Sequence, residues 1–153
     1  MTAVALVTAA LLIWAFAVAA IDWRQRRVPN LLLLALLLPA IATLAWQGKG
    51  LLAATWPVSL LGMAVALAVT LPGYAVSRLG AGDVKLAGVL GLVQGWPSVA
   101  WTLMAAALIL GAMSLAVVLH LGIANARSVR MPAAVAFAAG FAVVLLWQGR
   151  GWL

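Results

Sequence analysis

The chain has 153 residues, of which 68% are hydrophobic and 7% are charged, and its formal net charge is +7. This composition excludes an ordinary soluble domain and indicates an integral membrane protein. With no cysteine and a single histidine, the chain has no disulfide framework, thiolate metal site or cysteine nucleophile, and we expect neither a metal site nor a cofactor.

The apolar segments predict an all-α fold, a polytopic membrane helix bundle with about six transmembrane helices. Most of them approach the roughly 20 residues that cross a hydrocarbon core about 30 Å thick. Their continuous Leu, Ala and Val runs disfavour a transmembrane β-barrel. We expect one integral membrane domain over residues 1–153. The expected spans are 2–21, 31–46, 57–75, 99–123 and 132–147, together with a short one that contains the apolar run 86–93. Because this run is too short to cross at full thickness, either its helix starts near Asp83 or the membrane is thinner there.

The basic residues are concentrated in three loops between the spans. Loops 22–30, 78–85 and 124–131 hold seven of the nine Lys and Arg residues, and only Lys49 and Arg150 fall on the other side. Cytoplasmic loops of membrane proteins carry this excess, so these three loops are predicted to be cytoplasmic and the N-terminus to lie outside. The positive charge is therefore attributed to topology and to contact with anionic lipids, and no nucleic-acid partner is expected.

Asp22 and Asp83 are the only acidic side chains. Each lies at the end of an apolar run, and the predicted topology places both on the same side of the membrane. Either acid alone has an ordinary explanation, Asp22 as a helix-end partner of Arg26 and Asp83 as part of a turn. Acids at membrane depth cost about 2.5–3.5 kcal/mol on insertion scales and usually have a function, so we interpret the two as a pair.

Two neighbouring carboxyl groups can hydrolyse a peptide bond without a metal or a nucleophilic side chain. Because like charges a few ångströms apart cannot both ionise, the ionised partner acts as general base and the protonated partner donates to the scissile carbonyl. Asp22 and Asp83 are thus the candidate catalytic residues of a membrane-embedded aspartyl protease. The sequence does not decide which of them is the base.

Three neighbours of Asp83 are candidate shaping residues of its loop. Gly80 and Gly82 are expected to adopt positive φ angles and to let a substrate backbone approach Asp83 closely. Lys85 either balances the charge of the pair or is one more positive residue of a cytoplasmic loop.

The sequence around both aspartates resembles the prepilin peptidase family, the Gly-x-Gly-Asp membrane aspartyl proteases. Segment 22–30, DWRQRRVPN, is similar to the family's first-aspartate motif, and segment 80–86, GAGDVKL, looks like the second. Segment 129–140 is similar to the proline-to-glycine stretch that opens the last family helix, although the usual aromatic-Gly-Pro portion is not kept. The resemblance covers most of the chain.

This resemblance implies an endopeptidase of the bacterial inner membrane that cuts a short leader from type IV pilin-like precursors at the cytoplasmic face. It implies Asp22 and Asp83 as the catalytic pair, with Gly80 and Gly82 shaping the active loop. The implied partners are a prepilin or pseudopilin precursor helix and membrane lipids.

Larger members of this family add a cytoplasmic N-terminal domain with cysteines and an N-methyltransferase activity. This chain enters the membrane at once, so we expect no such domain. It looks like the short, peptidase-only branch associated with Flp-type or tight-adherence pili.

Three alternatives remain open from the sequence. A small multi-pass transporter or channel subunit would use the two aspartates to relay protons or a cation, with at least one acid on a conduit open to both sides. A structural assembly protein of a secretion system would bind partners without cleaving them. An archaeal preflagellin peptidase would share the motifs but act on another substrate. The precursor, its cleavage position and the oligomeric state are not predicted.

Overall fold

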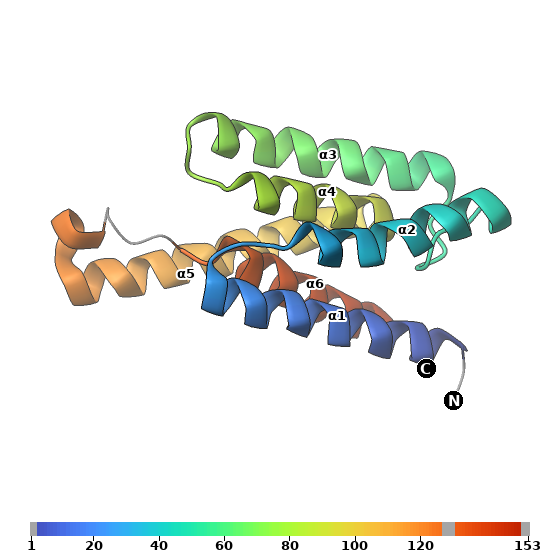
Figure 1. Cartoon of the computed structure of the whole chain (residues 1–153), viewed down its shortest axis with the longest axis horizontal. Helices are drawn as coiled ribbons and strands as arrows, with labels where there is room; N and C mark the ends of the chain where they lie inside the picture. Colours follow the sequence, from blue (N-terminus) through green and yellow to red (C-terminus); the bar gives the residue numbers. More distant parts are fainter. Residues whose placement is uncertain (1–2, 127–130, 151–153) are drawn as a thin grey trace.

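The computed structural model describes residues 3–126 and 131–150, which form a bundle of six α-helices (Figure 1). The predicted all-α fold is confirmed. Arg127 and Arg130 of the third basic loop lie outside the described residues. The helices are α1 (Ala3–Gln25), α2 (Asn30–Gln47), α3 (Trp56–Ala75), α4 (Ala81–Gln94), α5 (Ser98–Ala126) and α6 (Ala133–Arg150).

Four helices are long and apolar enough to cross a membrane: α1, α2, α3 and the Ser98–Gly122 part of α5. The apolar Ala133–Gln148 part of α6 is shorter. Helix α4 has 14 residues, which corresponds to a length of about 21 Å, less than the thickness of a hydrocarbon core. It begins at Ala81, in agreement with the explanation that the helix of the short apolar run 86–93 starts near Asp83.

Helix α4 lies at the centre of the bundle and packs against α2, α3, α5 and α6. Apart from Lys85, every residue from Val84 to Gln94 is buried. A helix that is apolar on all sides is stable only when other helices surround it. The position of Asp83 in the first turn of α4 is therefore determined by the packing of the central helix.

Helices α3 and α4 approach closely where Gly62 faces Gly91. A Cβ atom built on Gly91 would clash with the carbonyl oxygen of Gly62 and lie 2.8 Å from the Cα of Met63. A similar contact joins α5 and α6, where a Cβ on Gly140 would lie 2.8 Å from the carbonyl oxygen of Thr102. Glycine permits this close approach of helix backbones, which is a common way of packing membrane helices.

Trp14 connects α1 to two other helices. Its ring packs edge-on against Phe141 of α6 with a centroid distance of 6.4 Å, and its indole N–H donates to the backbone carbonyl of Leu32 in α2 at 2.8 Å. Helices α1 and α6 run side by side along the bundle (Figure 1). The end of α1 and the start of α6 consequently meet at one end of the molecule.

We expect Gly91→Ala to destabilise the bundle, because the clash is with backbone atoms of α3 that cannot move without separating the two helices. Overpacking of this kind costs about 1–3 kcal/mol. The matched control is Gly111→Ala on α5, where nothing lies within 4 Å of the added Cβ. Thermal unfolding in detergent, followed by tryptophan fluorescence, should give a lower Tm for Gly91→Ala only, and equal Tm values for the two variants would contradict the proposed packing.

Candidate active site

Asp22 lies near the end of α1 and is buried, with 4% of its surface exposed. Its Oδ2 accepts a hydrogen bond of 3.2 Å from the backbone N–H of Val135 in the first turn of α6. The first N–H groups of a helix have no partner within the helix and carry its positive dipole end, so they stabilise a negative charge. Asp22 is therefore held by the N-terminus of a helix that follows it by more than a hundred residues.

Arg26 directly follows α1 and contributes to the surroundings of Asp22. Its backbone has a positive φ of 54°, a left-handed conformation that costs a non-glycine residue about 1–2 kcal/mol. Its N–H donates to the carbonyl oxygen of Asp22 at 2.8 Å, and its guanidinium charge acts on the Asp22 carboxyl. The turn that ends α1 thus brings a positive charge close to the buried acid.

Asp83 lies in the first turn of α4, outside the four candidate spans, and is partly buried. Its Oδ2 accepts the backbone N–H of Gly80 at 3.0 Å, which caps the start of its own helix. Burial raises the pKa of Asp83 from 3.8 to about 6, the hydrogen bond from Gly80 opposes this rise, and the negative charge of Asp22 adds to it.

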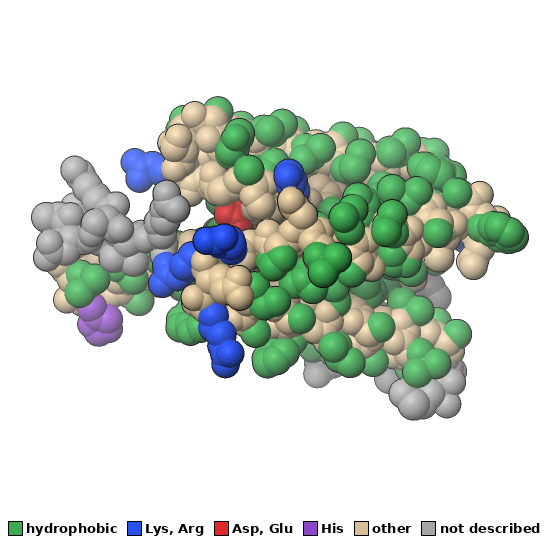
Figure 2. Space-filling model, in the orientation of Figure 1, with side chains coloured by type: hydrophobic (Ala, Val, Ile, Leu, Met, Phe, Trp, Pro, Cys, Tyr) green, Lys and Arg blue, Asp and Glu red, His purple; other side chains and the backbone are tan. Residues whose placement is uncertain are grey.

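The structure brings the two acids together. They are close enough for the charge of Asp22 to raise the pKa of Asp83, and both lie at the end of the bundle where α1 ends and α4 and α6 begin (Figure 1). Figure 2 shows acidic surface at this end with Lys and Arg side chains around it, whereas hydrophobic side chains cover much of the rest of this face. Because the negative charge of one disfavours ionisation of the other, the two carboxyl groups titrate as an interacting pair.

Gly80 and Gly82 do not adopt the positive φ angles expected from the sequence. Gly80 has a φ of −76°, and Gly82 is not among the residues with positive φ, because the helix already begins at Ala81. Gly82 instead packs against the loop after α1, where an added Cβ would lie 3.4 Å from the Cβ of Val28. An added Cβ on Gly80 would lie 3.1 Å from Oδ2 of Asp83. The two glycines therefore lie close to Asp83 and to Val28, respectively.

Lys85 is exposed, one helical turn beyond the start of α4. Two positions separate it from Asp83, which places the two side chains about 200° apart around the helix axis. Within the described ranges 3–126 and 131–150 no ion pair joins Lys85 to either acid. The structure therefore brings Asp22, Asp83, Gly80 and Gly82 into one region and leaves Lys85 at its margin.

The sequence did not identify the backbone N–H groups of Ala134 and Val135 as part of this site, although both interact with the Asp22 carboxyl. Backbone donors have no residue-type signature. Pro132 was the available signal, because proline often precedes a helix whose first N–H groups need an acceptor. The expected span start at Pro132 agrees with the observed start of α6 at Ala133.

A comparison with protein families matched residues 9–115 to a model described as the type IV leader peptidase family. This stretch covers more than half of the chain and includes both acids and both glycines of the site. Neither the comparison with curated proteins nor the comparison with solved structures found a match.

The interaction between the two carboxyl groups can be measured directly, because Asp22 and Asp83 are the only acidic side chains. In protein labelled with ¹³C at the aspartate carboxyl carbon, we expect the Asp83 signal to titrate near pH 6. Asp22→Asn removes a nearby negative charge and makes ionisation easier, so the pKa of Asp83 should fall in this variant. Lys49→Gln, at the other end of the bundle, is the control. An unchanged Asp83 titration in Asp22→Asn would show that the acids do not interact.

Proposed function

The chain belongs to the type IV leader peptidase family, whose members are aspartic endopeptidases, and we propose that Asp22 and Asp83 are its catalytic pair. One observation carries this proposal. The only two acidic side chains of the sequence belong to different helices, yet they interact at one end of the bundle. Membership in a family of endopeptidases favours this function over a transporter or channel subunit, and so does the position of both acids at the same end.

In the proposed mechanism one acid is ionised and acts on the attacking water, and the other is protonated and acts on the scissile carbonyl. The Asp22 carboxyl accepts the Val135 N–H at the start of α6, a position that accommodates a carboxylate, and the raised pKa of Asp83 favours its protonated form. We therefore assign Asp22 as general base and Asp83 as general acid. Asp22 takes a proton from water as the water attacks the scissile carbonyl carbon, and Asp83 donates its proton to the carbonyl oxygen. When the tetrahedral intermediate collapses, the C–N bond breaks, Asp22 gives the proton it took from water to the leaving amine, and Asp83 recovers its proton from the hydroxyl that becomes the product carbonyl.

We propose that the chain lies in the bacterial inner membrane with the acids at the cytoplasmic face and the N-terminus outside. The arrangement of charge supports this orientation. Arg24 and Arg26 at the end of α1 and Arg78 before α4 lie at the same end as the acids, whereas Lys49 follows α2 at the opposite end. An excess of Lys and Arg marks the cytoplasmic side of a membrane protein.

The proposed substrates are Flp-type pilin precursors, cut where the leader meets the apolar helix. The sequence motifs around both aspartates support a pilin-type substrate. The contacts of Gly80 with Asp83 and of Gly82 with Val28 support a compact loop beside the second acid. The same site would serve any precursor with an extended scissile segment at the cytoplasmic membrane surface.

Asp22→Asn and Asp83→Asn should each reduce precursor cleavage by a factor of at least about 10², because each removes one partner of general acid–base catalysis. Cleavage of a co-expressed Flp-type precursor in membranes measures this, with variant abundance checked by immunoblot. Lys49→Gln serves as the control, since it removes a charge at the opposite end, and it should cleave like the wild type. Normal cleavage by either aspartate variant at normal abundance would exclude the pair. A wild type that cleaves no precursor of a Flp-type panel would exclude this substrate class.

The cleavage rate should depend on pH with a single maximum. At low pH the rate falls because Asp22 becomes protonated and no base remains. At high pH the rate falls because Asp83 loses the proton that it must donate, and its raised pKa of about 6 places this decline above the pH at which an ordinary aspartate with a pKa of 3.8 would ionise. Initial rates with purified protein in nanodiscs give the profile, and a rate that keeps rising beyond neutral pH would contradict the assignment of Asp83 as the acid.

A further inference from the structure

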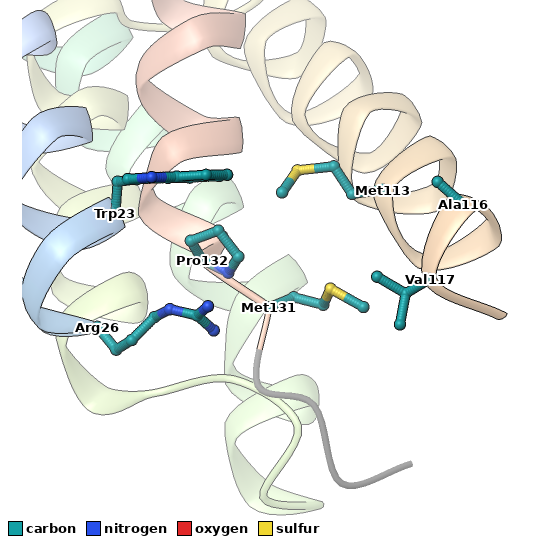
Figure 3. Close-up of a pocket in the computed structure, with 7 residues that line it drawn as sticks. All are labelled: Trp23, Arg26, Met113, Ala116, Val117, Met131 and Pro132. Carbon is teal, nitrogen blue, oxygen red and sulfur yellow. The ribbon is translucent and has the colours of Figure 1, made fainter. Parts of the chain in front are cut away.

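An apolar groove lies beside the acids, between the end of α1, the middle of α5 and the residues that lead into α6. Its volume is about 240 Å³. In Figure 3, Trp23 and Pro132 lie on one side of the groove, Met113 projects toward them from α5, and Met131 extends toward Val117. The groove is thus formed by three segments that are distant in sequence.

The walls of this groove are continuous with the surroundings of Asp22. Trp23 is the next residue of α1, and Pro132 directly precedes α6, whose Val135 N–H binds the Asp22 carboxyl. A polypeptide that occupies the groove is therefore brought to within about one helical turn of the candidate base.

The side chains of the groove suit a helix with a variable apolar surface. Met113 and Met131 are flexible thioethers, which adapt to different apolar partners. Ala116 is small and exposed, so a second helix backbone can approach α5 closely there. Beyond the groove the apolar surface continues along α5, where Leu115 is 59% and Leu119 75% exposed.

The groove also changes from polar to apolar along its length. Arg26 lines it at the level where α1 ends, and a guanidinium at a helix end lies at the head-group level of a bilayer. The methionines and Ala116 line the rest. A bound polypeptide that is polar near Arg26 and apolar beside the methionines and Ala116 would match this order.

We propose that this groove binds the apolar membrane helix of the precursor immediately beyond the scissile bond, so that the precursor enters laterally between α1 and α5. This inference rests on the proposed function and adds a binding site to it. The precursor helix is anchored in the bilayer and cannot leave it to reach the acids. A groove that begins at Trp23, the neighbour of Asp22 in α1, and extends to Ala116 of α5 holds the helix while the leader lies across the carboxyl pair.

A steric test uses Ala116→Trp, which fills the groove from α5. The matched control is Ala107→Trp, because Ala107 is also exposed on α5 and lies about 180° around the helix from Ala116. With purified protein and increasing precursor concentration, Ala116→Trp should raise KM several-fold and leave most of kcat, while Ala107→Trp should resemble the wild type. Equal KM values for Ala116→Trp and the wild type would overturn the inference.

A second test uses the absence of cysteine from the sequence. A precursor with one cysteine just after the cleavage site should cross-link through a short bis-maleimide to Ala116→Cys and not to Ala107→Cys, both in the Asp83→Asn background. Cross-linking to Ala107→Cys alone, or to both equally, would contradict the groove as the binding site. Failure of the groove proposal can be distinguished from failure of the proposed function. If the wild type cleaves the precursor but the Ala116 variants behave like their controls, only the groove proposal fails. If the wild type does not cleave, both proposals fail.

Discussion

A carboxyl group at the end of a membrane helix needs hydrogen-bond donors, and the arrangement of this bundle depends on how Asp22 obtains one. The backbone N–H of Val135 supplies it at 3.2 Å. The relation is reciprocal, because the first N–H groups of α6 also need an acceptor. One contact thus satisfies two helices that are distant in sequence and aligns the end of α1 with the start of α6. The packing of Trp14 on Phe141 supports the same alignment further along the two helices.

The two acids are positioned in different ways. Asp83 binds the N–H of Gly80 in its own helix, a local contact that forms wherever α4 begins. Its approach to Asp22 depends instead on the burial of α4 among four other helices and on the Gly62–Gly91 contact with α3. The loop at Val28 also packs directly against Gly82 at the start of α4. The environment of the pair is asymmetric as a result, with a helix N-terminus and an arginine beside one acid and a single local N–H on the other.

Much of the fold followed from the sequence because membrane spans must be long and apolar, and each helix begins and ends within a few residues of the expected bounds. The short run at 86–93 was informative for the same reason, since one of its two explanations, a helix starting near Asp83, agrees with the start of α4 at Ala81. The expectation of positive φ angles at Gly80 and Gly82 was wrong. Glycine residues that permit a turn and glycine residues that permit a close contact look alike in a sequence, and only the position of Val28 distinguishes them. The groove was not predicted either, because Trp23, Met113 and Met131 are ordinary apolar residues in a chain composed largely of such residues.

The sequence by itself determined the helical class, the candidate pair Asp22 and Asp83, and their expected location at one side of the membrane. Composition and backbone hydrogen bonding decide these features. Apolar runs in a chain with 68% hydrophobic residues must form helices to pair their backbone groups in a membrane, and only two acidic side chains are available to form a pair. Only the tertiary structure decided that the acids lie at the same end of the bundle, that the start of α6 holds Asp22, and that a groove lies beside Trp23 and Pro132. These features depend on backbone N–H groups and on the relative positions of helices far apart in the chain. Such relations come from packing, which sets the depth and contacts of each helix and has no local signature in the residues themselves.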